Sequence, residues 1–307
     1  MVEDGFKDGM DLMKNLVVVR GGGDLATGII HRIWRAGFKV VITEVPQPTA
    51  IRRTVSFAEA VYSKVTVVEN VRAQLVSNDQ QAYQILKMGF IPIIIDTKAQ
   101  IINKIKPLAV VDAIIAKRNL GTQLTDAPIV IGIGPGFTVG QDVHAVIETK
   151  RGHHLGRVIT SGTAASNTSI PGVIDGHASK RVLYAPASGS YKGCRQISDF
   201  VQADELVAFV GSSEIRANIS GVLRGILHDG LTVETGTKVG DIDPRGVKEH
   251  CFTISDKARA VGGGVLEALM LFSDNSYTTD AHAMGRGSEK RLRGEVSEAR
   301  GLFRSGW

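Results

Sequence analysis

The chain has 307 residues, with 36 Lys or Arg against 31 Asp or Glu and a formal net charge of +5. Hydrophobic residues make up 43%, a composition typical of a soluble globular protein with room for two domains. Basic and acidic residues are interspersed, which argues against nucleic-acid binding, and apolar runs such as Ile91–Ile95 are too short to span a membrane. The acidic N-terminus does not resemble an export signal, so we expect a cytoplasmic protein.

From Leu16 onward, short β-branched runs alternate with stretches of helical periodicity, as in the βαβ units of a parallel sheet. The predicted strands cover residues 16–20, 39–44, 64–68, 91–96, 108–111 and 128–133, and the predicted helices cover 24–36, 79–88 and 112–117. The pattern predicts an α/β fold with a Rossmann-like doubly wound parallel sheet over residues 1–160, ending in an antiparallel hairpin.

An internal repeat follows a polar loop at 161–176. A shift of 32 residues aligns 185–192 with 217–224 and 201–210 with 233–242 without a gap. Two such halves predict a small barrel-sandwich-like β module over 177–250, similar to biotinyl and lipoyl domains. The turn at Gly211–Glu214 has no lysine to carry a cofactor, so a swinging-arm role is not expected.

The C-terminal part is predicted to be a helix at 251–272 that packs back on the first domain, followed by a mobile tail at 273–307. Three consecutive glycines, Gly262 to Gly264, interrupt the helical pattern. Each costs about 1 kcal/mol relative to alanine, and close packing against another backbone would explain them.

A glycine-rich turn between the first strand and the first helix is the strongest functional signal. Gly21, Gly23 and Ala26 fit the dinucleotide-binding pattern G-x-G-x-x-A, and an acid ends the second strand where a ribose-binding carboxylate is expected. The candidate cofactor-binding residues are Gly21, Gly22, Gly23, Asp24, Ala26 and Glu44, for NAD(P) or another nucleotide. The alternative is a plain turn in which Asp24 caps the helix and Glu44 is solvated.

A second group of candidates lies at other strand ends and after a second glycine strip at 132–140. An acid at the carboxyl end of a parallel strand faces the usual ligand crevice, and an arginine with histidines can clamp an anion. The candidates for substrate or anion binding are Asp96, Asp112, Gly134, Gly136, Asp142, His144, Arg151 and His153. Ordinary caps and surface turns are the alternative, and no spacing of histidines or of Cys194 and Cys251 indicates a metal site.

Four motifs, taken together, resemble an accessory-protein family of the selenium-dependent molybdenum hydroxylase system. They are V-V-V-R-G-G-G-D-L-A-T-G, V-V-I-T-E-V-P-Q-P-T-A-I-R-R, I-G-I-G-P-G-F-T-V-G-Q-D-V-H and G-V-L-R-G-I-L-H-D-G, and the resemblance extends from about Asn15 to Phe272. It implies a role in maturing molybdenum hydroxylases, by cofactor or selenium insertion, with a client hydroxylase as partner and the molybdenum cofactor in transit.

Three functional classes remain open from the sequence. The first is a maturation factor that binds a nucleotide-bearing cofactor at Gly21–Ala26, the second an NAD(P)-dependent oxidoreductase, and the third a non-catalytic adaptor. A homo-oligomer is compatible with each. The sequence does not decide whether the chain catalyses a reaction.

Overall fold

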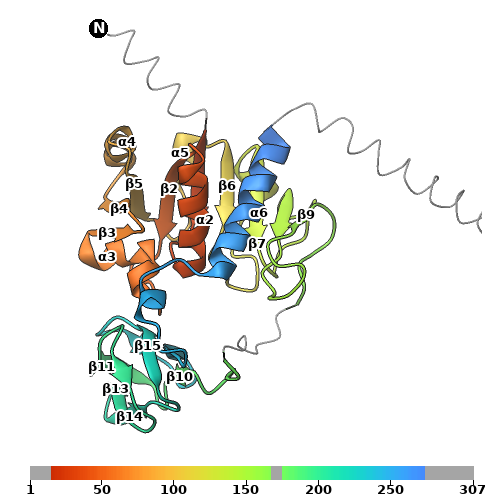
Figure 1. The fold of residues 1–307 in the computed structure, drawn as a ribbon. Helices are drawn as coiled ribbons and strands as arrows, with labels where there is room; N and C mark the ends of the chain where they lie inside the picture. Colours follow the sequence, from red (N-terminus) through yellow and green to blue (C-terminus); the bar gives the residue numbers. More distant parts are fainter. Residues whose placement is uncertain (1–14, 167–174, 274–307) are drawn as a thin grey trace, which may run out of the picture.

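The computed structural model describes residues 15–166 and 175–273, which form a larger and a smaller part (Figure 1). The larger part contains a nine-stranded sheet, here called the large sheet. The smaller part contains strands β10 to β17 between residues 182 and 243 and is called the β unit. Apart from Ser273, the predicted tail lies outside the described residues.

The large sheet has the strand order β3-β4-β5-β2-β1-β6-β7-β8-β9. Its strands are β1 (Leu16–Arg20), β2 (Lys39–Glu44), β3 (Val65–Val68), β4 (Val71–Val76), β5 (Ile91–Ile95), β6 (Ala109–Asp112), β7 (Ile129–Ile133), β8 (Ala145–Ile147) and β9 (Val158–Ile159). The seven strands from β4 to β8 in this order pair in parallel. Their carboxyl ends therefore share one edge of the sheet, which is where the candidate site lies.

Helices cover both faces of the large sheet. They are α2 (Asp24–Arg35), α3 (Ala60–Ser63), α4 (Asp79–Lys87), α5 (Ile101–Ile105) and α6 (Asp256–Ser273), with short 3-10 turns η1 (Arg53–Val55), η2 (Phe57–Glu59), η3 (Leu124–Asp126) and η4 (Lys248–Cys251). Alternate residues of β1 point to opposite faces. Val17 and Val19 pack with α2 and α6, whereas Leu16 and Val18 pack with α4 and α5.

Helices α2 and α6 lie side by side on one face (Figure 1) and meet at glycines. A Cβ atom at Gly28 would lie 2.5 Å from the Cβ of Ala258, and one at Gly262 would lie 2.8 Å from the carbonyl oxygen of Gly28. A Cβ at Gly264 would overlap the carbonyl oxygen of Gly156. The close backbone approach that we expected from the glycines of α6 is therefore present.

The β unit consists of two antiparallel sheets of four strands, ordered β10-β17-β15-β12 and β14-β13-β11-β16. Its strands are β10 (Val182–Tyr184), β11 (Gly189–Gly193), β12 (Phe200–Val201), β13 (Leu206–Val210), β14 (Ser213–Arg216), β15 (Gly221–Ile226), β16 (Thr232–Val233) and β17 (Lys238–Asp243). A shift of 32 residues relates each strand of the first sheet to the strand at the same place in the second sheet: β10 to β14, β17 to β13, β15 to β11 and β12 to β16. Each sheet thus combines strands from both halves of the repeat around one shared core.

The expected fold class, a Rossmann-like doubly wound parallel sheet followed by a barrel-sandwich-like β module, is wrong. The antiparallel hairpin expected at the end of the sheet is present as β8–β9, but β3 also pairs antiparallel to β4, so the large sheet is mixed, and the β unit has two separate antiparallel sheets. In the β3–β4 hairpin the turn residues Glu69 and Asn70 both have positive φ, 44° and 68°. Two such residues reverse the chain within a tight turn. A Val/Ile pattern identifies strands but does not encode the direction of their pairing.

The segment after β2 holds the β unit against the sheet. A Cβ at Gly225 of β15 would lie 2.7 Å from the carbonyl oxygen of Ile51, so the two backbones touch. The Nε of Arg53 donates a hydrogen bond of 2.9 Å to the carbonyl oxygen of Ile226. These contacts place one face of β15 opposite the carboxyl edge of the large sheet.

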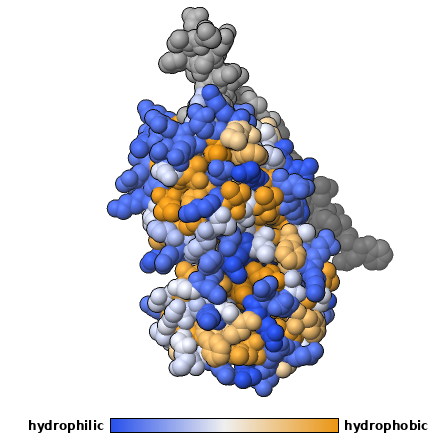
Figure 2. Space-filling view, turned by 90° about the vertical axis from the view of Figure 1, so that its left-hand side faces the viewer, coloured by the Kyte–Doolittle hydropathy of each residue, from blue (hydrophilic) through white to orange (hydrophobic). Residues whose placement is uncertain are grey.

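Among the described helices, none is both long and apolar enough to cross a lipid bilayer. Figure 2 shows hydrophobic residues in separate patches with hydrophilic residues between them on the face it presents.

Candidate functional site

A cleft of about 1420 Å³ separates the carboxyl edge of the large sheet from the β unit. The β1–α2 loop, the end of β2 and the start of α6 line one side, and residues of β15, β17 and the segment before β10 line the other. Nine basic and four acidic residues line the cleft. Its charge balance favours an anionic ligand.

The β1–α2 loop is built by three glycines with different roles. Gly21 has φ of +92° and donates its N–H to the carbonyl oxygen of Thr43 at 2.8 Å, which fixes the turn. Gly22 is packed, since a Cβ there would lie 2.9 Å from the amide nitrogen of Ala58. Gly23 precedes α2 with φ of −62°, and a Cβ there would meet no atom within 4 Å. Gly23 therefore presents backbone to open cleft, as a close ligand approach requires.

Glu44 closes this loop. Its Oε1 accepts the N–H of Gly22 at 2.9 Å and its Oε2 accepts the N–H of Val45 at 2.7 Å. Burial raises the pKa of the Glu44 carboxyl, and the two backbone hydrogen bonds act in the opposite direction. The carboxylate lines the cleft with remaining lone pairs, so it can still accept a hydroxyl group.

Asp24 is the first residue of α2 and accepts the N–H of Leu25 at 2.8 Å. Its carboxylate places negative charge at the helix N-terminus, where a phosphate would otherwise be favoured. Arg52 approaches Asp24 at 3.5 Å and also donates to the carbonyl oxygens of His250 and Thr253, both at 2.9 Å. Arg52 thus partly neutralises the negative charge of Asp24 and connects α2 to the segment before α6.

The two strand-end aspartates differ in position. Asp96 lines the cleft and accepts the N–H of Ile101 at 2.8 Å at the start of α5. Asp112 is 2% exposed and does not line the cleft, because it accepts the hydroxyl of Thr122 at 2.6 Å and lies 3.4 Å from Arg20. Asp112 and Arg20 therefore anchor the loop after β6.

The second glycine strip folds against protein rather than against the cleft. A Cβ at Gly134 would lie 2.6 Å from the hydroxyl of Thr149, and one at Gly136 would lie 2.6 Å from the amide nitrogen of Arg118. Asp142 accepts hydrogen bonds from the side chain of Asn119 at 2.9 Å and from the N–H of Thr138 at 2.8 Å. The strip is therefore a loop held in place by contacts with the rest of the protein.

The histidine candidates also lie away from the cleft. The Nδ1 of His144 accepts the N–H of Val130 at 3.0 Å, and burial lowers the pKa of His144. His153 is exposed and meets His154 edge to face at 4.9 Å between ring centres. Neither side chain lines the cleft.

Arg151 reaches the cleft from the loop after β8, but it is already paired. Its Nη1 and Nη2 donate to the two carboxylate oxygens of Asp256 at 2.7 and 3.0 Å. The hydrogen bonds that Arg151 donates to Asp256 lower the pKa of Asp256 from 3.8 to about 2 and raise the pKa of Arg151. Arg151 therefore braces the first turn of α6 at the rim of the cleft.

We expect Arg151→Ala to destabilise the protein by less than about 1 kcal/mol at pH 7, because the pair is largely exposed. Asp256 has a lowered pKa in the folded state, so its contribution is present above its unfolded pKa of 3.8 and lost as the pH falls towards 2. Urea unfolding at about pH 7 and about pH 2.5 should show the difference from wild type shrinking in acid. Arg157→Ala is the control, and an undiminished difference in acid would contradict the pairing.

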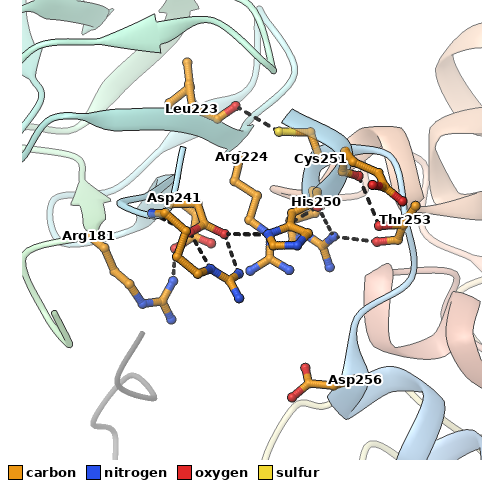
Figure 3. Close-up of polar contacts among 12 residues, drawn as sticks. Arg181, Leu223, Arg224, Asp241, His250, Cys251, Thr253 and Asp256 are labelled. Carbon is orange, nitrogen blue, oxygen red and sulfur yellow. Dashed lines mark hydrogen bonds and ion pairs between the residues drawn. The ribbon is translucent and has the colours of Figure 1, made fainter. Parts of the chain in front are cut away.

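The opposite wall of the cleft contains basic residues that the sequence analysis did not single out (Figure 3). Arg181 pairs with Asp241, and Arg245 binds Asp243 through both carboxylate oxygens at 2.9 and 2.6 Å. Arg224 lies 3.9 Å from Asp243 and donates to the carbonyl oxygen of His250 at 3.3 Å. The signal in the sequence was an arginine inside the apolar strand V-L-R-G-I.

Lys257, in the first turn of α6, is the other residue missed from the sequence. It lines the cleft, and no hydrogen-bond or ion-pair partner for its amine lies among the described residues 15–166 and 175–273. Burial is the main cause that lowers the pKa of Lys257, and Arg151 adds to it. In the described part of the chain, no group of three or more metal-binding side chains occurs.

Comparison with known proteins gives one strong sequence match. The chain is similar to the uncharacterized protein YqeB of Escherichia coli K12, with 51% identity over 256 residues. The match covers 83% of this chain and 47% of YqeB, so the chain spans about half the length of that relative. No protein-family model matches the chain.

Two solved structures show weak similarity. One is an aspartoacylase family protein from Mesorhizobium loti, with 12% identity, a TM-score of 0.25, and 74% of this chain and 84% of that chain covered. The other is the ectoine utilization protein EutE (DoeB) from Ruegeria pomeroyi, with 12% identity, a TM-score of 0.23, and the same coverage of 74% and 84%. These TM-scores are too low for either protein to inform the chemistry of this chain.

Proposed function

We propose that the chain binds a nucleotide-bearing cofactor in the cleft and acts as an accessory factor in the maturation of molybdenum hydroxylases. One observation supports the binding step above all: the open backbone of Gly23 precedes α2 at a cleft with nine basic and four acidic residues. A strand, a glycine turn and a helix N-terminus together present N–H groups to a phosphate.

The residues around Gly23 fit a nucleotide in part. The carboxylate of Glu44 faces the cleft and can accept a ribose hydroxyl, and no protein acceptor for the N–H of Gly23 lies within the described residues. Asp24 repels a phosphate at the same helix end, and Arg52 at 3.5 Å offsets that repulsion. When bound, the cofactor would supply the reacting group, while the chain would orient it.

The maturation role rests on the resemblance of the four sequence motifs to the accessory-protein family. On that basis the partner is a client molybdenum hydroxylase in the cytoplasm, and the ligand is NAD(P), another nucleotide, or the molybdenum cofactor in transit. The relative YqeB adds no activity to this argument, because it is uncharacterized.

Isothermal titration with ADP, NAD⁺ and NADP⁺, together with mass spectrometry of small molecules that co-purify with the protein, tests the binding step. We expect binding of at least one nucleotide or a co-purifying nucleotide-bearing cofactor. If neither is found, the binding step is wrong, and co-purification with a hydroxylase would then support a non-catalytic adaptor. Turnover of NAD(P)H with a small substrate and no client would instead support an oxidoreductase.

A further inference from the structure

Arg224 is a buried cation that shares its counter-ion, Asp243, with Arg245. It is 8% exposed and lies 3.9 Å from Asp243, whose two carboxylate oxygens already bind Arg245. Its Nε donates to the carbonyl oxygen of His250, and no acceptor for its terminal amino groups lies among the described residues. Figure 3 shows Arg224 and Arg181 on the wall of the β unit that faces α6. Burial and the nearby Arg52 lower the pKa of Arg224.

Lys257 faces the same cleft from the opposite side, at the start of α6. Lys257 is half-buried, and its amine has no hydrogen bond or ion pair within the described residues, although the charges of Asp24, Glu148 and Asp256 act on it from farther away. Taking a cation out of water is costly unless an anion or hydrogen-bond acceptors replace the water. Two such cations on facing walls of one cleft therefore indicate that an anion from outside the chain completes the site.

We propose that Arg224 and Lys257 form a second anion subsite, which binds a phosphate group of the ligand separately from the glycine loop. The guanidinium can bind two phosphate oxygens through parallel hydrogen bonds, and the ammonium adds a third donor group. The carboxylates of Asp24 and Glu44 lie at the glycine loop itself, so a highly charged phosphate is better accommodated between Arg224 and Lys257.

The subsite narrows the ligand class that the proposed function leaves open. The inference rests on the proposed function only in taking the ligand to be a nucleotide; the anion subsite itself does not depend on it. A nucleotide with two separate phosphate groups, as in a phosphorylated dinucleotide, would use the glycine loop for one group and Arg224 with Lys257 for the other. The size of the cleft, about 1420 Å³, accommodates a ligand larger than a single nucleotide.

Titration of the full chain with inorganic phosphate at fixed pH and ionic strength tests the subsite directly. Arg224→Gln and Lys257→Met should each weaken phosphate binding by roughly 10-fold or more, since each removes a charge-assisted contact. Lys192→Met is the matched control, because the 32-residue repeat aligns Lys192 with Arg224 but Lys192 is exposed on the other sheet. Lys192→Met should leave phosphate binding unchanged.

The proposal is overturned if wild-type protein does not bind phosphate, or if both cleft variants bind phosphate like wild type. Lys257→Met keeps the test valid should Arg224→Gln lower the melting temperature. Titration with ADP separates the two proposals. If only Gly23→Val loses ADP binding, the result supports the proposed function without the subsite. If the wild-type protein binds no nucleotide but binds phosphate in a way that requires Arg224 and Lys257, the result supports the subsite alone.

Discussion

Replacement of Gly264 by alanine should destabilise the protein by about 1–3 kcal/mol, whereas the same change at the neighbouring Gly263 should stabilise it by about 0.5–1 kcal/mol. A Cβ at Gly264 would overlap the carbonyl oxygen of Gly156 and lie 2.9 Å from Cγ2 of Ile147. The backbone at Gly156 cannot easily move, because its N–H is bound to the carbonyl oxygen of Glu148 at 2.9 Å. The clash therefore outweighs the gain in helix propensity that alanine brings.

Gly263 is the internal control for Gly264. It lies in the same turn of α6, and a Cβ there would meet no atom within 4 Å, so only the helix propensity changes. Urea unfolding monitored by circular dichroism measures both variants, and unchanged slopes would show that the extent of unfolding is the same. A stabilising effect at both positions would mean that α6 does not pack closely against the loop at Gly156.

The sequence predicted the central strands of the large sheet because their Val and Ile runs are buried on both faces. It did not predict the fold class, since the edge strand β3 pairs antiparallel to β4 through the turn Glu69–Asn70, where a positive φ is uncommon for a glutamate. The predicted helix over 112–117 is absent, because β6 ends at Asp112, and both Ile115 and Lys117 adopt positive φ. Local apolar spacing did not reveal either departure.

The glycine loop could be identified from the sequence because a dinucleotide-binding loop depends on the spacing of glycines within a short segment. Gly21, Gly23 and Glu44 lie together at the cleft, although Glu44 is engaged with the loop backbone rather than solvated. The basic wall was not identifiable, since Arg224 reaches the cleft only because the β unit folds back against Ile51. The second glycine strip was misleading because neighbouring protein atoms fill the space beside Gly132, Gly134 and Gly136.

Gly23→Val should weaken nucleotide binding by roughly 10- to 150-fold, which corresponds to the loss of about 1.5–3 kcal/mol of charge-assisted hydrogen bonding. The valine side chain would project into the open cleft and block the approach of a phosphate to the backbone. The φ of −62° suits valine, so the loss of stability should stay near the ~1 kcal/mol that a poor helix cap costs. Calorimetric titration and melting temperature measure the two effects separately.

Asp24→Asn provides the partner variant with an effect of opposite sign. The asparagine oxygen can still accept the N–H of Leu25, which Asp24 accepts at 2.8 Å, while the negative charge at the helix N-terminus is removed. Because repulsion between Asp24 and a phosphate falls and Arg52 loses its partner at 3.5 Å, nucleotide affinity should rise. Weaker binding in Asp24→Asn together with unchanged binding in Gly23→Val would show that Asp24 contacts a donor group of the ligand and that its phosphate lies elsewhere in the cleft.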